Sequence, residues 1–299
     1  MKFSNEKFEA RQPNDRLSLL KIQGDPSGFI ASQFTPGKLT VRTRQGLTVA
    51  AGRSLLFVGG DVTFEESLIQ ISAPTAQRTI DIGGLAEAGE ILLTRQDNLL
   101  NLSYAQNLVK SNILLDNSQV QVLTGSGGNL VVNARNLTLK NNSELIVGVI
   151  GGANFPNAKA GDLNLNITDS ISILSGSKVS NEVPPIARAK VTAGDVNINT
   201  RRLIVENSIV RSDVFRDGTA GTLRINALES IQLVGEFPIS PVNPNSDPAK
   251  VGPGGLFAQV NKGATNSQGG TIDINTPKLI LRDGAKIQTA VFGEGKRGH

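Results

Sequence analysis

The sequence GDVNINTRRLIVEN, residues 194–207, contains the pattern that decides the fold. After the opening glycine, apolar side chains stand at every second position, at Val196 and Ile198, and again at Leu203 and Val205. Alternation with a period of two gives a strand one apolar and one polar face, whereas an amphipathic helix needs a period of 3.6 residues. The segment therefore predicts two short β-strands joined by a polar turn.

This pattern occurs five times, and each copy opens with a glycine. The five copies are GNLVVNARNLTLKN from Gly128, GDLNLNITDSISIL from Gly161, the segment from Gly194, GTLRINALESIQLV from Gly221 and GTIDINTPKLILRD from Gly270. Successive glycines are 33, 33, 27 and 49 residues apart. A third short apolar segment follows each copy after a polar turn, as in GAKIQTA at residues 284–290. One repeat is therefore expected to be three short strands.

Three strands cannot bury their apolar faces alone, but stacked copies can, because each strand then pairs in parallel with its counterpart one repeat away. The sequence thus predicts an all-β, right-handed parallel β-helix of about ten coils, with three short strands per coil. Residues 37–299 are assigned to this solenoid, and residues 1–36 to an irregular N-terminal segment or cap. The long spacing before Gly270 contains a Pro-rich stretch at residues 235–252, which is expected to be a surface-loop insertion.

Asparagine occupies the fifth position after the opening glycine in every copy. These residues are Asn133, Asn166, Asn199, Asn226 and Asn275. Stacking would place them above one another, where their amides can form a hydrogen-bonded ladder. The alternative is that asparagine is used here only because it tolerates left-handed turn geometry.

Composition excludes several classes of function. The 299-residue chain has no cysteine, which rules out a disulfide framework, a thiol nucleophile and a cysteine metal site. Its net charge of +4 is dispersed, without a basic stripe interleaved with aromatics, so no nucleic-acid partner is expected. The first residues contain no apolar run typical of a secretory signal peptide, and no stretch of 18 apolar residues occurs.

Chemical motifs are equally sparse, so no catalytic residue, metal site or cofactor is predicted. The single histidine is His299, which leaves serine without a partner for an acyl-transfer triad. Asp162 and Asp195 occupy the same position of consecutive copies, and their stacking indicates either a solvated turn or a weak Ca²⁺ site. Asp213 and Asp217 are expected to be solvated in a polar turn.

Three stretches resemble known proteins: GRSLLFVGGDVTF at residues 52–64, ISAPTAQRTIDIGGLAEAGEI at residues 71–91, and residues 252–295. They are similar to large exoproteins of the filamentous haemagglutinin type, which belong to two-partner secretion systems. The resemblance covers roughly residues 37–299. It implies a right-handed β-helix, export through an outer-membrane β-barrel transporter, and a secreted or cell-surface adhesin.

The chain departs from this family at its N-terminus, where neither the signal peptide nor the secretion domain with its Asn-Pro-Asn motif is seen. The sequence NPN at residues 243–245 lies inside the late insertion and is interpreted as coincidence. FGEGKRG at residues 292–298 repeats the spacing of FRDGTAG at residues 215–221, in which the final glycine opens a new copy. The chain is therefore interpreted as a fragment of a longer exoprotein.

The leading hypothesis is a non-enzymatic β-helical segment that acts in adhesion or haemagglutination and presents the 235–252 loop to an unknown cell-surface or carbohydrate ligand. Deleting this loop should leave the β signal in circular dichroism intact. Two alternatives remain open at this point. One is a polysaccharide-active β-helix enzyme, a lyase or a hydrolase, which would need clustered carboxylates on one outer face. The other is a nonfunctional gene fragment.

Overall fold

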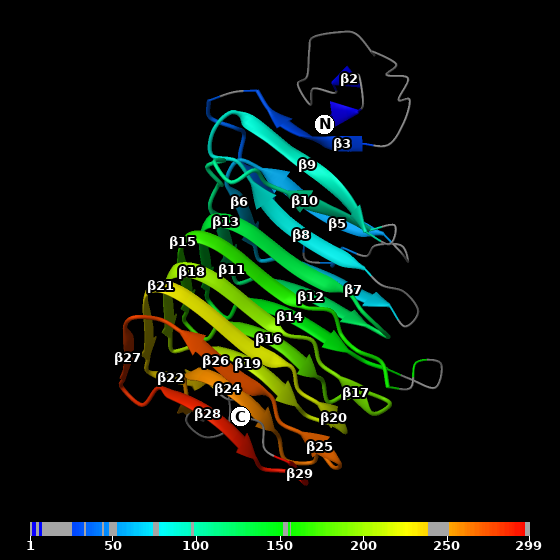
Figure 1. Cartoon of the computed structure of the whole chain (residues 1–299), viewed down its shortest axis with the longest axis vertical. Coiled ribbons are helices and arrows are strands. Elements are labelled where there is room, and N and C mark those ends of the chain that lie inside the picture. Colours follow the sequence, from blue (N-terminus) through cyan, green and yellow to red (C-terminus); the bar gives the residue numbers. More distant parts are fainter. Residues whose placement is uncertain are drawn as a thin grey trace.

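The computed structural model describes residues 2–3, 6–7, 26–32, 34–43, 45–47, 53–73, 78–96, 99–151, 155, 157–238 and 251–296. The described residues form 29 strands and no helix, so the predicted all-β class is confirmed (Figure 1). A search of the same residues for a helix long and apolar enough to cross a membrane found none.

The largest sheet is built from strands that pair in parallel although they lie far apart in the sequence (Figure 1). Its central path contains β4 (Leu39–Val41), β6 (Val62–Glu65), β11 (Ile113–Asp116), β13 (Asn129–Lys140), β15 (Leu163–Leu174), β18 (Val196–Glu206), β21 (Thr222–Val234) and β26 (Thr271–Asn275). Three further strands lie off this path: β27 (Leu279–Arg282) pairs with β21, β8 (Thr79–Gly84) pairs with β13, and β5 (Ser54–Gly59) pairs with β8.

Two other parallel sheets follow the same order along the chain. A seven-stranded sheet contains β7 (Leu68–Ala73), β12 (Gln119–Thr124), β14 (Glu144–Val149), β16 (Lys178–Val183), β19 (Ile209–Val214), β24 (Gly255–Val260) and β28 (Lys286–Val291). A four-stranded sheet contains the short strands β17 (Val191–Thr192), β20 (Gly218–Thr219), β25 (Ser267–Gln268) and β29 (Gly295–Lys296). The chain thus visits the sheets in rotation, which is compatible with a β-helix.

The predicted pairing of equal positions in the five copies is confirmed. In the second position after the glycine, the Cα partners run in register through Leu130, Leu163, Val196, Leu223 and Ile272. The third segments also pair in parallel, as β14 with β16 and β16 with β19. Correct register keeps every apolar position on the inner face, since a slip by one residue would expose the whole set.

One detail differs from the expected three short strands. In β13, β15, β18 and β21 the first two segments form one continuous strand of 11 to 13 residues. The register shifts at the polar junction, for example between Ala134 and Asn136, so an irregularity bends the strand instead of a turn ending it. The junction divides the long strands into a first and a second part. Among the described residues, eight strands stack in the column of second parts, namely β4, β6, β11, β13, β15, β18, β21 and β27. About ten coils were expected.

The inner faces of the sheets form one apolar core made almost entirely of Val, Ile and Leu. Pairs of alternating residues such as Leu163 and Leu165, or Leu203 and Val205, are at most 1% exposed. Phe57 and Phe64 add an edge-to-face ring pair with centroids 5.0 Å apart. Burial of this kind is the main favourable contribution to folding, at roughly 25 cal/mol per Å² of apolar surface.

The opening glycines are required by close contact between neighbouring strands. A Cβ atom at Gly194 would lie 2.0 Å from the carbonyl oxygen of Gly161, and one at Gly221 would lie 1.9 Å from that of Gly194. These distances are far below van der Waals contact with a backbone atom, which cannot rotate away. The glycine column therefore marks the corner where successive backbones approach most closely.

An antiparallel sheet interrupts the parallel pattern. β3 (Pro26–Ala31) pairs with β9 (Gly89–Gln96), and β9 pairs with β10 (Leu99–Ser103); β1 (Lys2–Phe3) and β2 (Glu6–Lys7) extend the sheet beyond β3. The predicted division at residue 36 placed β9 and β10 in the parallel unit and β3 outside it. The three strands instead form one sheet, and its residues Ile91 and Leu102 pack with Leu85 and with the outward side chains of β5.

The predicted insertion at residues 235–252 is anchored by a short hairpin. β22 (Glu236–Pro238) and β23 (Val251–Pro253) pair antiparallel at its base. The part between them, including NPN at residues 243–245, lies outside the described residues. The predictions for residues 297–299, which include His299, also lie outside them.

Candidate functional site

The outward faces of the parallel strands bring together the five asparagines that the sequence analysis singled out. The five asparagines are Cα partners in one unbroken column. None of them has a positive φ, so left-handed turn geometry does not account for them. Positive φ is found at other asparagines, among them Asn117, Asn142 and Asn207.

Side-chain hydrogen bonds join this column in two sections. Asn166 Nδ2 donates to Asn133 Oδ1 at 3.3 Å, and Asn133 Nδ2 donates to Asp81 Oδ1 at 3.1 Å. Farther along, Asn275 Nδ2 donates to Asn226 Oδ1 at 3.1 Å. Within the described chain no side-chain hydrogen bond joins Asn199, which is exposed, to either neighbour. The column is thus aligned throughout and hydrogen-bonded at both ends.

Asp162 and Asp195 do not form a shared carboxylate site. Asp162 Oδ1 accepts from the Asp195 backbone N–H at 2.9 Å, and Asp195 Oδ1 accepts from the Thr222 N–H at 2.8 Å. Burial opposes ionisation of Asp195, but the Thr222 N–H and the Arg224 guanidinium together hold the pKa of its carboxyl below the usual value. Each carboxylate therefore binds the backbone of the next strand. The described residues also contain no group of three or more potential acidic, histidine or cysteine metal ligands.

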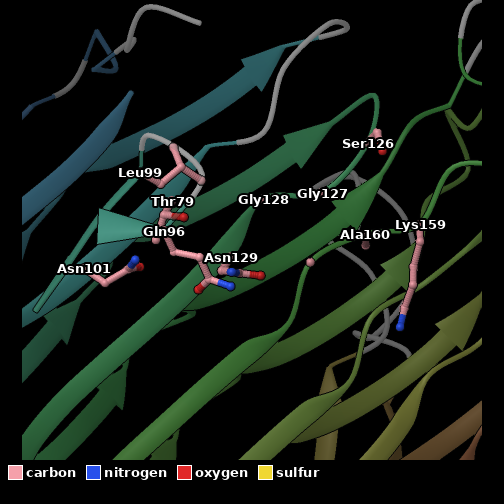
Figure 2. Close-up of a pocket in the computed structure, with 11 residues that line it drawn as sticks. Thr79, Gln96, Leu99, Asn101, Ser126, Gly127, Gly128, Asn129, Lys159 and Ala160 are labelled. Atoms are coloured by element: carbon pink, nitrogen blue, oxygen red, sulfur yellow. The ribbon is translucent and has the colours of Figure 1, made fainter. Parts of the chain in front are cut away.

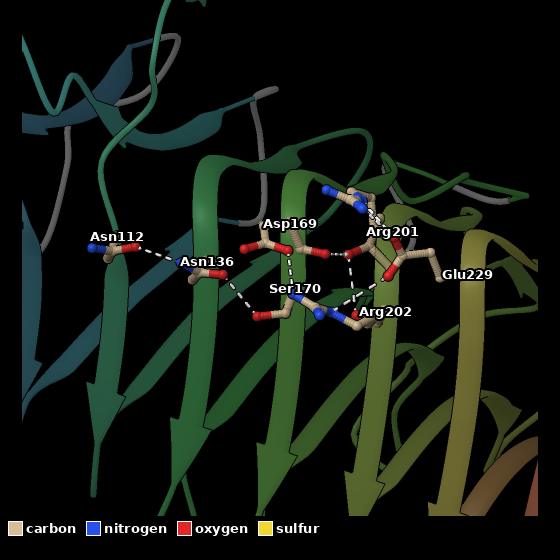
Figure 3. Close-up of polar contacts among 8 residues, drawn as sticks. Asn112, Asn136, Asp169, Ser170, Arg201, Arg202 and Glu229 are labelled. Atoms are coloured by element: carbon tan, nitrogen blue, oxygen red, sulfur yellow. Dashed lines mark hydrogen bonds and ion pairs between the residues drawn. The ribbon is translucent and has the colours of Figure 1, made fainter.

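A second polar column lies at the bend of the long strands (Figure 3). Asn136 Nδ2 donates to Asn112 Oδ1 at 2.9 Å, and Ser170 Oγ donates to Asn136 Oδ1 at 2.7 Å. It continues into exposed ion pairs: Arg202 contacts Asp169 at 2.5 Å, and Arg201 pairs with Glu229. Exposed pairs of this kind contribute less than about 1 kcal/mol each, so their main effect is to occupy the polar groups of the surface.

Sequence reasoning missed a third column, which consists of buried serines. Each backbone N–H in this column donates to the next serine Oγ at 3.0–3.2 Å, through Ser67, Ser118, Ser143, Ser177 and Ser208. The readable signal was asparagine or glycine directly before four of these five serines, since those residue types favour the positive φ that the structure has there. This column fixes the corner that leads into the seven-stranded sheet.

The seven-stranded sheet carries one compact charged cluster, formed by Glu182, Arg211 and Asp213. Arg211 Nη2 lies 3.0 Å from Glu182 Oε2, and Arg211 Nε lies 3.9 Å from Asp213 Oδ2. The expectation that Asp213 is solvated in a turn is wrong, because this residue belongs to β19 and is only 2% exposed. Asp213 Oδ1 instead accepts from the Gln259 N–H at 2.9 Å.

Burial affects the two acids of this cluster differently. For Asp213 burial dominates and raises the pKa of its carboxyl. For Glu182 burial acts in the same direction, but the charges of Arg211 and Lys178 outweigh it and lower the pKa. Two carboxyls with pKa values pushed apart are one mark of acid–base catalysis. Glu182 is only 7% exposed, however, so the cluster presents its charges to its own strands rather than to solvent.

Asp217 is held by a neighbouring loop rather than by solvent alone. Its Oδ1 accepts from the Thr265 hydroxyl at 2.6 Å and from the Thr265 N–H at 3.1 Å, and these bonds lower the pKa of its carboxyl. The contact joins two turns 48 residues apart in sequence. Asp217 therefore has a structural partner in the next turn of the stack.

Asp81 is a further acid whose pKa is raised by burial. It is a fully buried residue of β8, and Leu102 N–H of β10 donates to its Oδ2 at 2.7 Å while Asn133 donates to its Oδ1. Burial raises the pKa of its carboxyl to about 7, although these hydrogen bonds and the nearby Lys110 act in the opposite direction. Asp81 therefore links the antiparallel sheet to the parallel one.

Comparison with known proteins found no match among family models, curated proteins or solved structures. Function must therefore be argued from geometry. The columns of asparagine, aspartate and serine hold neighbouring strands together, and the outward columns form a long polar surface. The acids described above bond to backbone groups, to arginine or to neighbouring polar side chains, and they do not form an open cluster.

Proposed function

We propose that this chain is a segment of a right-handed parallel β-helix from a secreted or cell-surface exoprotein of the filamentous haemagglutinin-like, two-partner secretion type. In this proposal the parallel sheets are walls of one solenoid with three faces per coil. The segment acts in adhesion and haemagglutination and does not catalyse a reaction. Its partners are an outer-membrane β-barrel transporter during export and a cell-surface ligand afterwards.

The observation that carries the proposal is the in-register stacking of polar columns on the outward faces. Asparagine, serine and aspartate side chains bond from strand to strand along the stack. Such bonds resist shear between neighbouring strands, and repeat architectures of this kind behave as stiff, quasi-one-dimensional bodies. A stiff body that extends contact groups away from an anchoring point suits adhesion better than turnover.

Export by a two-partner route is supported by composition as well. Absence of cysteine removes any disulfide that would lock the chain before it crosses a membrane. Folding by addition of one coil to the previous coil suits a chain that emerges gradually, since each repeat needs only its neighbour. The family resemblance of residues 52–64 and 71–91 supports the same route.

A polysaccharide-active enzyme is the second candidate, and the Glu182–Arg211–Asp213 cluster is the observation that favours it. The cluster has the acids that glycoside cleavage requires. Its burial argues against it, since a polymer would have to reach carboxyls that are less than a tenth exposed. Incubation with pectin, alginate and related polymers tests this candidate. Turnover that disappears in Asp213→Asn would replace the adhesive proposal.

Adhesion is tested with the purified full chain coupled to fluorescent beads. Beads carrying the chain should bind erythrocytes and epithelial cells and agglutinate erythrocytes, whereas beads carrying an unrelated all-β protein of similar charge should not. Heat-unfolded chain on the same beads serves as the matched control, because it keeps the composition and loses the stacked surface. Equal binding by folded and unfolded chain would contradict the proposal.

A further inference from the structure

A cavity of about 330 Å³ lies where the antiparallel sheet meets the parallel one (Figure 2). Its wall comes from three parts of the chain: the start of β8, the β9–β10 hairpin, and the turns that open β13 and β15. Figure 2 shows Thr79, Gln96, Asn101 and Asn129 gathered at one end, with Leu99 beside them. The volume is in the range of small-molecule sites.

Thr79 is the unusual group in this wall. It is 1% exposed, and its Oγ1 has no hydrogen-bond partner within the described chain. A buried hydroxyl without a partner destabilises the fold, and native proteins contain few of them. A ligand in the cavity supplies the missing hydrogen bond when the Thr79 side chain turns towards it, because its oxygen is closed off from solvent as it stands.

The other polar groups of the wall are neutral amides and hydroxyls. Asn129 Oδ1 already accepts from the Asp162 N–H at 2.9 Å, which leaves Nδ2 as its donor for a ligand. Gln96 and Asn101 each add a carbonyl oxygen and an amide nitrogen. Among the described residues that line the cavity there is no carboxylate, and their one cation, Lys159, lies at the far end and acts on the charge of Asp195.

We propose that this cavity binds a neutral hexose residue at the end of a glycan. Neighbouring hydroxyls of a hexose both donate and accept, and amide side chains match them in pairs. The buried Thr79 hydroxyl completes the set, and Leu99 offers an apolar surface to the C–H face of the ring. This inference rests on the proposed adhesive function and specifies the ligand class of one contact point.

The test uses the full chain and saturation-transfer NMR with methyl α-mannoside, methyl β-galactoside and methyl β-glucoside, with methyl β-glucuronide as the charged comparison. At least one neutral glycoside should give a saturable signal that exceeds the signal of the glucuronide. Asn101→Leu should abolish the signal, because it replaces a hydrogen-bonding amide of the wall by an apolar side chain of similar size. Asn107→Leu is the matched control, because Asn107 is exposed in the turn after β10, and it should change nothing.

Thr79→Val separates a binding role from a structural one. Valine has the same shape, so loss of an unpartnered hydroxyl should leave the urea midpoint unchanged or higher. Affinity for the glycoside should nevertheless fall by about tenfold, the usual effect of one hydrogen bond to a ligand. Absence of binding by all neutral glycosides, preference for the glucuronide, or unchanged binding in Asn101→Leu would each overturn the proposal.

The bead assay distinguishes failure of this site from failure of the proposed function. Beads carrying Asn101→Leu that adhere as well as the original chain would mean that adhesion is real and uses another surface. Beads carrying the original chain that do not adhere at all would remove the adhesive function itself. Adhesion that is lost in Asn101→Leu and retained in Asn107→Leu is the expected result.

Discussion

Two strands of this protein contain the same tetrapeptide in very different surroundings. Thr-Ile-Asp-Ile forms residues 79–82 of β8 and residues 271–274 of β26, and the two copies occupy the same columns of one sheet. In β8 all four side chains are at most 1% exposed. In β26 both isoleucines are only partly buried and Asp273 is exposed.

The difference arises from neighbours and not from local sequence. β8 lies between β5 and β13, and β10 contacts it as well. β26 pairs with β21 alone among the described strands. Stability in a stacked repeat is therefore a property of the interface between copies, and identical strands contribute unequally.

Replacement of one isoleucine in each copy should give the largest contrast. Ile82→Ala should lower the free energy of unfolding by about 2–5 kcal/mol, the usual cost of a cavity in a closed core. Ile274→Ala should cost about 1 kcal/mol, because part of that side chain already contacts water. Urea midpoints with unchanged slopes measure both. Equal losses would mean that β26 is as well packed as β8.

The aspartate of the β8 tetrapeptide should also make the stability of the protein depend on pH. Burial raises the pKa of Asp81 to about 7 in the folded chain, whereas its ordinary value is 3.8. The folded state then holds a proton that the unfolded state releases between these values, so the contribution of Asp81 to stability is greatest below pH 4 and is lost as the pH rises to about 7. The size of this loss is roughly 4 kcal/mol.

Asp81→Asn should remove this part of the pH dependence and raise stability at pH 8 relative to the original chain. Asp273→Asn, which removes the exposed aspartate of the same column, is the comparison variant. Urea denaturation at pH 5 and pH 8 distinguishes the variants. A profile that keeps its full slope in Asp81→Asn would assign the pH dependence to other acids, of which the buried Asp213 is the first to examine.

Much of the architecture could be predicted from the period of two and the opening glycines. These features predicted parallel strands and their register, because equal positions can stack only one way without exposing the apolar face. They could not predict the hairpin of β9 and β10. GEILLTRQ and LLNLS also alternate, and alternation alone does not distinguish antiparallel from parallel pairing.

The candidate site was less predictable because its properties depend on burial. Asp213 has a polar sequence context, yet β19 holds it against Arg211 and Gln259. Thr79 begins a tetrapeptide that occurs again from Thr271. Only Thr79 lines a cavity, because the hairpin of β9 and β10 lies beside it. No pattern within a single repeat contains that information.

The asparagine column offers the smallest and most selective test of the comparison. Asn133 is 6% exposed, donates to Asp81 and accepts from Asn166, so Asn133→Ala leaves two partners short of a hydrogen bond. We expect a loss of about 1–3 kcal/mol, the cost of unsatisfied buried polar groups. Asn275→Ala removes one exposed hydrogen bond to Asn226 and should cost less than about 1 kcal/mol.

Hydrogen exchange identifies the strands that each substitution destabilises. Asn133→Ala should speed exchange in β8 and β15, the two strands that its side chain joins, while Asn275→Ala should affect β26 only. Asn199 lies in the middle of the column but has no side-chain bond to it. Asn199→Ala should therefore lower stability as little as Asn275→Ala does. If Asn199→Ala were as costly as Asn133→Ala, position in the stack would matter more than hydrogen bonding, and the column would stabilise the strands through packing.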